Sequence, residues 1–222
     1  MQVSAAALWI NTVFASFDES VTLAIHNLFY PMSGFFTPFF NFISLLGKGG
    51  IALILLSFVL MYFKKTRRMG TAMLIAVTVG ALFTNCFLKI VIARPRPYAD
   101  ESSIFYKLWL TVGQKTESDK SFPSGHTCAA FATMTGMFLT GDKRKSWTAY
   151  IFAFLMGLAR IYLVVHYPTD VIGGIIVGTI SGIIGTVICA HLPAKWYSMD
   201  IDFKNGRGGR RKGSGGKHVR VD

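Results

Sequence analysis

The chain has 222 residues, of which 52% are hydrophobic and only 15% are charged. Soluble domains carry about 25% charged residues, so this composition excludes a soluble enzyme and a disordered protein. The formal net charge is +12, but most Lys and Arg residues gather just outside apolar stretches, as in the cytoplasmic segments of membrane proteins. We therefore expect one integral membrane domain that contacts membrane lipids and no nucleic acid.

Five apolar stretches are long enough, or nearly so, to be membrane spans. They cover residues 49–63, 69–92, 124–140, 146–166 and 169–192. Residues 1–17 form a sixth, weaker candidate, because the stretch is short and Asn11 interrupts it. The predicted fold class is all-α, a polytopic membrane bundle of five to six transmembrane helices.

The chain divides into three predicted segments. Residues 1–48 are expected to form short or interfacial helices, because residues 18–47 are aromatic, amphipathic and punctuated by Gly and Pro. Residues 49–192 are expected to form the transmembrane catalytic core. Residues 193–222 are expected to form a basic, Gly-rich and disordered cytoplasmic tail, because they lack apolar periodicity.

The basic clusters predict the topology of the chain. Lys64–Arg68, Lys143–Lys145 and the basic tail are separated from one another by pairs of predicted spans. All three clusters therefore lie on one side of the membrane, which the positive-inside rule identifies as cytoplasmic. The loop of residues 98–122, and the turn between the last two spans, then lie on the outer side.

Three segments place polar groups at the ends of predicted spans. They are Lys89–Pro97, Phe122–His126 and Ala159–Asp170. The predicted topology brings all three segments to the same outer face. Polar groups inside a membrane are costly and usually functional, so this convergence predicts a functional site there.

The cations of these segments predict an anion site. Lys89, Arg96 and Arg160 are three positive charges with one acidic residue among the three segments. At low dielectric such charges favour an anion between them, and guanidinium groups match phosphate oxygens. Ser124 is expected at a helix N-cap, where free N–H groups bind anions, and Gly125 lets a ligand approach the backbone. We therefore expect these five residues to bind a phosphate group.

Two histidines can carry the chemistry. Asp170 follows His166 by four residues, so its carboxylate can hold one imidazole nitrogen and leave the other as a nucleophile. His126, on a different span, can protonate the leaving oxygen. The three segments contain no Asp/Glu pair, Cys cluster or His-x-His to hold a metal, so we expect no metal and no cofactor. Arg94 is expected to contact lipid headgroups rather than the ligand.

Each of these residues also has a structural interpretation. An intramembrane Arg can be an anchor whose charge reaches the interface, and Ser124 with Gly125 can be an ordinary helix cap. Asp170 can simply complement the start of a helix. Because these interpretations would require unrelated accidents on one face, a single site is favoured.

The three motifs read Lys-x6-Arg-Pro, Pro-Ser-Gly-His and Arg-x5-His-x3-Asp. In this order, over residues 89–170, they resemble the motifs of the type-2 phosphatidic acid phosphatase superfamily, the lipid phosphate phosphatases. The resemblance implies a helical membrane bundle in which His166 attacks phosphorus to form a phosphohistidine, and His126 acts as general acid and then activates water. It also implies which residues hold the phosphoryl oxygens without metal: Lys89, Arg96, Ser124, Gly125 and Arg160. Ala159 stands where the family usually has Ser, which removes one hydroxyl group near the phosphate.

The expected outer-face site favours a lipid whose headgroup is presented outside the cytoplasm. Undecaprenyl diphosphate, hydrolysed at the extracytoplasmic face of the cytoplasmic membrane, is the substrate that the resemblance favours. Phosphatidylglycerol phosphate or phosphatidate is the alternative. An anion or phosphate transporter is an alternative from another class, but it would place cations along a whole path. A catalytically inactive lipid-binding protein is disfavoured, because both histidines and Asp170 are present.

Overall fold

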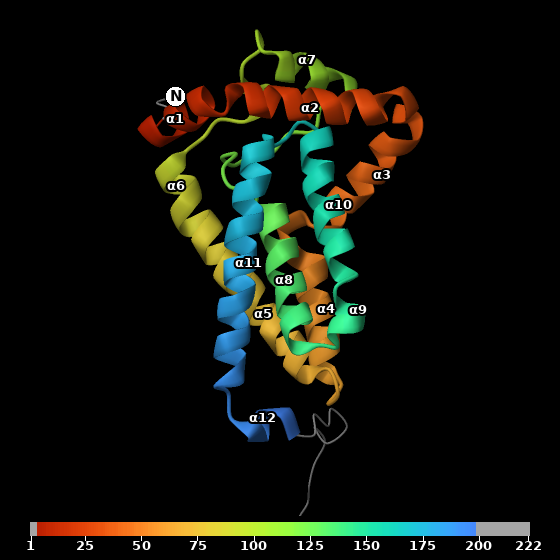
Figure 1. Ribbon diagram of the computed structural model, residues 1–222, viewed down its shortest axis with the longest axis vertical. Coiled ribbons are helices and arrows are strands. Elements are labelled where there is room, and N and C mark those ends of the chain that lie inside the picture. Colours follow the sequence, from red (N-terminus) through yellow and green to blue (C-terminus); the bar gives the residue numbers. More distant parts are fainter. Residues whose placement is uncertain (1–3, 199–222) are drawn as a thin grey trace, which may run out of the picture.

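The computed structural model describes residues 4–198, which are helical and contain no strand. This result confirms the all-α class. Several helices run side by side along the long axis (Figure 1). They are α4 (Ile51–Tyr62), α5 (Arg67–Ala81), α8 (Gly125–Thr140), α10 (Ala149–Tyr162) and α11 (Pro168–Ala190).

The N-terminal helices cross one end of this bundle. α1 (Ala5–Val13) and α2 (Ala15–Phe29) lie almost at right angles to it, and α7 (Ile104–Thr111) lies over α2 (Figure 1). After the turn η1 (Tyr30–Met32), α3 (Ser33–Leu46) descends beside α10. Aromatic packing holds α3 there, since the ring centroids of Phe40 and Tyr162 are 4.9 Å apart. The predicted segment boundary at residue 48 falls in the turn η2 (Lys48–Gly50), between α3 and α4.

The predicted number of five to six transmembrane helices is not confirmed. Within residues 4–198, two helices are long and apolar enough to span a membrane. One is α11, and the other is the run Arg67–Ala99, which joins α5, the π-helix η3 (Leu82–Leu88), α6 (Lys89–Ile92) and η4 (Pro97–Ala99). A third span results if the pair Ala15–Leu46 and Lys48–Tyr62, bent by 41°, counts as one.

The other predicted spans are short helices. α8 has 16 residues and α10 has 14, fewer than the ~20 that a straight apolar span needs. α1, in the weaker sixth candidate, has nine.

Small residues bring α11 and α8 into close contact. A Cβ added to Gly174 would lie 2.7 Å from the Ser124 carbonyl oxygen, and one added to Gly178 would lie 2.6 Å from that of Cys128. Both positions therefore require glycine, and the small-residue face packs inside the bundle. This contact fixes the start of α8 against the start of α11.

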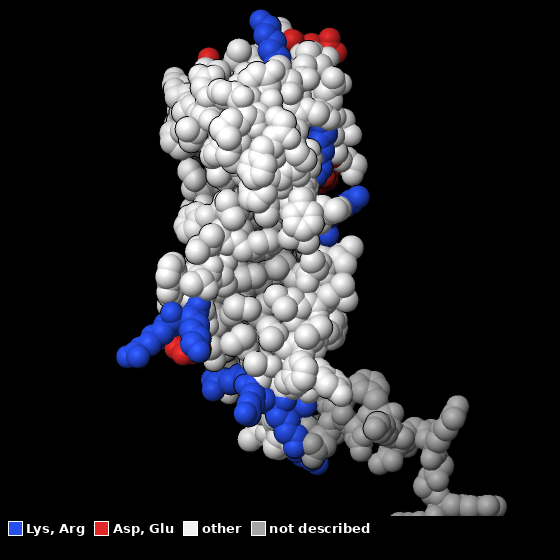
Figure 2. All heavy atoms as spheres, turned by 90° about the vertical axis from the view of Figure 1, so that its right-hand side faces the viewer, with Lys and Arg blue, Asp and Glu red and all other residues white. Residues whose placement is uncertain are grey.

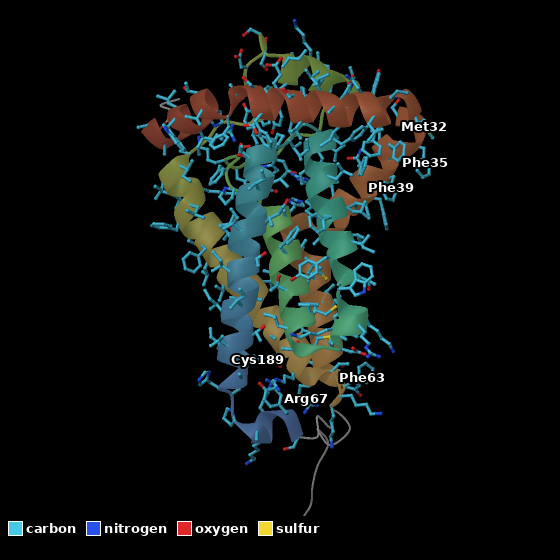
Figure 3. The ribbon with its side chains drawn as sticks, in the orientation of Figure 1. Met32, Phe35, Phe39, Phe63, Arg67 and Cys189 are labelled. Carbon is cyan, nitrogen blue, oxygen red and sulfur yellow. The ribbon has the colours of Figure 1, made fainter. Side chains whose placement is uncertain are left out.

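The surface has an apolar middle and charged ends. Figure 2 shows Lys and Arg gathered near the end of the bundle opposite α2, a few more along one edge of the other half, and a broad uncharged area on the face toward the viewer. Lys64–Arg68, α9 (Lys143–Ser146) and α12 (Ala194–Ser198) share this end (Figure 1). Large apolar side chains are exposed along the helices, and Figure 3 shows Met32 and Phe35 pointing away from the bundle. These features fit a membrane location; the predicted tail from residue 199 onward lies outside the described residues.

Candidate active site

The three predicted motifs meet at the end of the bundle that α1 and α2 cross. The first is the start of α6 and the segment after it, the second is the start of α8, and the third connects α10 with α11. Hydrogen bonds between them include one from the Ser124 amide to the Asp170 carbonyl oxygen (3.0 Å) and one from Arg96 Nη1 to the Val165 carbonyl oxygen (2.7 Å). Segments that are distant in the sequence therefore form one site.

His166 lies between Arg96 and Asp170. Arg96 Nη1 is 2.8 Å from His166 Nε2; because a guanidinium group only donates, this contact favours a lone pair on Nε2. His166 Nδ1 is 3.5 Å from Asp170 Oδ2, which is longer than a normal hydrogen bond. Asp170 Oδ2 instead accepts from the Ser121 hydroxyl (2.5 Å) and the Tyr167 amide (2.9 Å). The structure thus places Asp170 next to His166, as predicted, and the Ser121 hydroxyl and Tyr167 amide hold the Asp170 carboxylate in position.

Asp119 holds both cations of the first motif. Its carboxylate forms ion pairs with Lys89 Nζ and Arg96 Nη2, and its carbonyl accepts from Arg96 Nε at 3.0 Å. Lys89 and Arg96 are buried, whereas the Asp119 side chain is half exposed. Burial alone raises the pKa of Asp119, but the hydrogen bond and charge of Lys89, together with Arg96, lower it below the usual value for aspartate. The carboxylate is therefore ionised at neutral pH.

Arg160, the cation of the third motif, is paired in the same way. It is fully buried in the last turn of α10, where Nη2 forms an ion pair with Glu117 and Nη1 donates to Ser44 Oγ of α3 at 2.5 Å. Its Nε is buried and has no hydrogen-bond partner within residues 4–198. All three cations predicted to bind phosphate are thus paired with Asp119 or Glu117, two acids of the loop between α7 and α8.

The second motif contributes a helix start and His126. Ser124 is the N-cap of α8, and its hydroxyl oxygen accepts from the Thr127 amide (3.4 Å) and hydroxyl (2.9 Å). A Cβ added to Gly125 would lie 3.6 Å from Lys89 Nζ, so the backbone here faces the cations. His126 Nε2 is buried and has no partner in the described part of the chain. A buried ring nitrogen without a partner is unusual in a folded protein.

The motifs alone do not predict Glu117 and Asp119. They contain one acidic residue, Asp170, so the expectation of few acids near the cations is wrong. The fold adds two carboxylates because the loop between α7 and α8 runs back across the site before it reaches the second motif. No fixed spacing relates these acids to a motif; the one available signal is their place just before Phe122–His126.

The sequence predicts that Arg94 contacts lipid headgroups, but this prediction is wrong. The Arg94 side chain is fully buried. Its Nη1 pairs with Asp170 Oδ1 (2.7 Å), its Nη2 with Asp18 Oδ2 (2.8 Å), and its Nε donates to Asn11 Oδ1 (2.7 Å). The guanidinium carbon also lies 3.8 Å from the Tyr167 ring centroid, a cation–π contact. The prediction fails because two carboxylates attract Arg94 inward, and Arg94 thereby connects Asp170 to α1 and α2.

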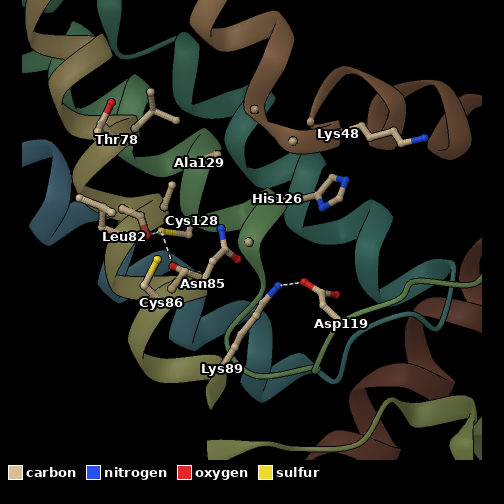
Figure 4. Close-up of a pocket in the computed structure, with 18 of the residues that line it drawn as sticks. Lys48, Thr78, Leu82, Asn85, Cys86, Lys89, Asp119, His126, Cys128 and Ala129 are labelled. Carbon is tan, nitrogen blue, oxygen red and sulfur yellow. Dashed lines mark hydrogen bonds and ion pairs between the residues drawn. The ribbon is translucent and has the colours of Figure 1, made fainter. Parts of the chain in front are cut away.

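A cavity of about 620 Å³ opens beside these groups. Figure 4 shows Lys89, Asp119 and His126 around it. Its wall continues along apolar side chains that include Ile54 and Val77. One cavity therefore offers a charged region and an apolar region, as an amphiphilic ligand requires.

The arrangement provides the groups for phosphoryl transfer. Arg96, Lys89 and Arg160 can exchange their carboxylate partners for phosphoryl oxygens. Imidazole groups such as those of His166 and His126 can act as nucleophiles or exchange protons. Within the described residues, no group of three or more His, Cys, Asp or Glu side chains is placed to hold a metal ion.

Comparison with known proteins finds a family model and relatives that are named as phosphatases or diphosphatases. A family model described as the PAP2 superfamily matches residues 69–192. Undecaprenyl-diphosphatase BcrC of Bacillus subtilis is 32% identical over 104 residues, which are 47% of this chain and 50% of that protein. Lipid A 4'-phosphatase of Porphyromonas gingivalis is 31% identical over 179 residues, 77% of this chain and 75% of that protein. The match to BcrC thus spans about half of that protein's length.

A solved structure shares the fold. It is the first transmembrane PAP2-type phosphatidylglycerolphosphate phosphatase from Bacillus subtilis, with a TM-score of 0.62 and 25% sequence identity. The superposition covers 85% of this chain and 92% of that structure. It therefore extends well beyond the residues that the family model matches.

Proposed function

The chain belongs to the PAP2 superfamily, and we propose that it is a membrane phosphatase that hydrolyses a lipid phosphate or diphosphate through a phosphohistidine. The observation that carries this proposal is the convergence of three cations and two histidines at one end of the bundle. Two of their buried nitrogen atoms, Arg160 Nε and His126 Nε2, have no partner within residues 4–198. Both suit contacts to a substrate.

The first chemical step forms the phosphohistidine. The phosphoryl oxygens bind Lys89, Arg96 and Arg160 in place of the two loop carboxylates, and the start of α8 adds backbone N–H groups. Nε2 of His166 attacks phosphorus with its lone pair, and the bond from phosphorus to the leaving oxygen breaks. His126 gives its proton to that oxygen.

The second step releases inorganic phosphate. His126, now neutral, takes a proton from a water molecule, whose oxygen attacks the phosphorus of the phosphohistidine. The nitrogen–phosphorus bond breaks and His166 regains its lone pair. Asp170 stabilises the positive charge on the imidazole throughout, and the cations take the place of a metal ion, so the reaction needs none.

Undecaprenyl diphosphate is the substrate that we favour. The relative BcrC is named an undecaprenyl-diphosphatase, and the basic clusters support a site on the extracytoplasmic face of the cytoplasmic membrane. Phosphatidylglycerol phosphate is the second candidate, favoured by the structural relative of that specificity. Phosphatidate carries the same phosphomonoester and belongs to the same alternative.

The experiment is a phosphate-release panel with the purified protein in detergent. The substrates are undecaprenyl diphosphate, phosphatidylglycerol phosphate, phosphatidate and lipid A, and His166→Ala is the matched control. We expect undecaprenyl diphosphate to give the highest kcat/KM. Absence of phosphate release from every lipid would refute the proposal. Phosphate flux into vesicles with wild-type protein would then favour the transporter.

Sidedness is tested with two serines that are exposed at opposite ends of the structure. Ser118 lies in the loop beside the site, and Ser198 ends α12 at the basic end. We expect Ser118→Cys, in a background without other cysteines, to react with a membrane-impermeant maleimide on intact cells, and Ser198→Cys to react only after lysis. The reverse pattern would place the site in the cytoplasm and favour a lipid phosphate of the inner leaflet.

A further inference from the structure

Two lysines outside the three motifs lie next to the site. Lys115 Nζ donates a hydrogen bond to Ser44 Oγ at 2.8 Å, and the same oxygen accepts from Arg160 Nη1 at 2.5 Å. Two cations thus share one buried hydroxyl oxygen. Because like charges so close repel each other strongly at low dielectric, this arrangement favours an additional anion.

No carboxylate within residues 4–198 forms an ion pair with Lys115. Glu117, the nearby acid, is paired with Arg160. Burial, followed by the charge of Arg160, lowers the pKa of Lys115; the charge of Glu117 raises it, and the charge of Lys48 lowers it again, so the net shift is downward. Lys115 is therefore a half-buried cation whose neighbours are mostly cations.

Lys48 approaches the site from the turn between α3 and α4. It lines the same cavity as His126 and Lys89. A Cβ added to the preceding residue, Gly47, would lie 2.9 Å from His126 Cδ2, so the backbone of this turn passes directly beside the imidazole. In the view of Figure 4 the His126 ring lies between the side chains of Lys89 and Lys48.

The position of His126 separates two regions of the substrate. In an in-line displacement by His166, the leaving oxygen lies on the far side of phosphorus, next to His126. A phosphomonoester has an uncharged chain beyond that oxygen, whereas a diphosphate has a second phosphate there. Cations close to that second phosphate therefore favour a diphosphate over a monoester.

We propose that Lys115 and Lys48 form a subsite for the second phosphate of a lipid diphosphate. This inference rests on the proposed function, because it takes His166 as nucleophile and His126 as acid. His166 attacks the terminal phosphorus, the bond to the bridging oxygen breaks, and His126 protonates that oxygen. The departing lipid monophosphate then stays bound to Lys115 and Lys48, with its chain along the apolar wall of the cavity.

The test compares a matched pair of soluble substrates, farnesyl diphosphate and farnesyl monophosphate. We expect Lys115→Gln to lower the ratio of their kcat/KM values, diphosphate over monophosphate, about tenfold, as for one lost charge-assisted hydrogen bond. Lys48→Gln should lower this ratio in the same direction. Lys107→Gln, at an exposed position on α7, is the control and should leave the ratio unchanged. An unchanged ratio in both test variants would overturn the subsite.

A binding experiment keeps the subsite testable if the proposed function fails. His166→Ala protein is heated with inorganic pyrophosphate or with orthophosphate, and the melting temperatures are compared. We expect pyrophosphate to stabilise the protein more than orthophosphate, and Lys115→Gln to remove the difference. Equal stabilisation by both anions would overturn the subsite, whereas loss of turnover alone would refute only the phosphatase.

Discussion

Asp18→Asn should impair catalysis although residue 18 lies on α2, outside all three motifs. The Asp18 carboxylate is buried and accepts three hydrogen bonds, one from Arg94 Nη2 (2.8 Å) and two from the amide (2.9 Å) and hydroxyl (2.8 Å) of Thr169. An Asn side chain keeps one oxygen but turns an NH2 group toward another donor. Arg94 then keeps one carboxylate partner, Asp170, instead of two.

The magnitude follows from these contacts. Loss of one buried charge-assisted hydrogen bond costs about 2–3 kcal/mol, so the melting temperature in detergent should fall by roughly 4–12 °C. Because Arg94 pulls on Asp170, a shift of that carboxylate disorients His166, and kcat should fall about ten- to a hundredfold with little change in KM. Glu19→Gln, at the exposed neighbouring position, is the matched control.

The assay measures melting temperature, kcat and KM for both variants in parallel. If Asp18→Asn lowers the melting temperature but leaves kcat equal to that of Glu19→Gln, the contacts that join Asp18, Arg94 and Asp170 stabilise the fold without affecting catalysis. If neither quantity changes, the buried ion pair between Asp18 and Arg94 is refuted as well. A rise in KM with unchanged kcat would contradict the proposal that Asp18 positions His166 through Arg94 and Asp170.

Four further outcomes are expected. His166→Ala should lower phosphate release by at least about a thousandfold, and Asp170→Asn by less, since it orients rather than attacks; equal activity of Asp170→Asn and wild type would contradict this. The Asp119→Asn variant should bind vanadate about fivefold more tightly than wild type. The substitution removes a carboxylate that competes with vanadate for Lys89 and Arg96, and whose ion pairs contribute ~1 kcal/mol. The pKa of Asp119 is lowered in the folded protein. Its ion pairs therefore stabilise the protein above the ordinary aspartate pKa, and this stabilisation is lost as the pH falls through the lowered value. The difference in stability between wild type and Asp119→Asn should close in acid below roughly pH 4. Activity should persist in EDTA, and a loss that added Mg²⁺ restores would refute the metal-free mechanism.

The sequence predicts the motif residues well because each motif is local and chemically specific. Arg96, His166 and Asp170 meet as their spacing and the span order require. The extent of the helices is predicted unevenly: α8 (Gly125–Thr140) matches the predicted stretch 124–140, whereas α10 (Ala149–Tyr162) is shorter than the predicted 146–166 at both ends. Within residues 4–198, two or three spans are long and apolar enough to cross a membrane, so the predicted five to six are not confirmed.

Long-range pairing explains the residues that the sequence does not reveal. Arg94 and Asp18 are 76 positions apart, and no periodicity connects a loop arginine to one aspartate on an aromatic helix. Glu117 and Asp119 likewise lie in an irregular loop. Such pairs depend on how α2 and the loop fold over the bundle, which only the three-dimensional structure defines.

The helix pair laid across the end of the bundle limits how this protein can be recombined with its relatives. The family model matches residues 69–192, a range that contains every motif residue but omits Asp18 of α2 and Ser44 of α3. A chimera that joins residues 69–192 to the N-terminal helices of another superfamily member would keep the reacting groups. It would nevertheless lose the buried carboxylate of Asp18 and the hydroxyl of Ser44 beside Arg160. Grafting activity or specificity between members therefore requires transferring both parts together, as one co-adapted unit.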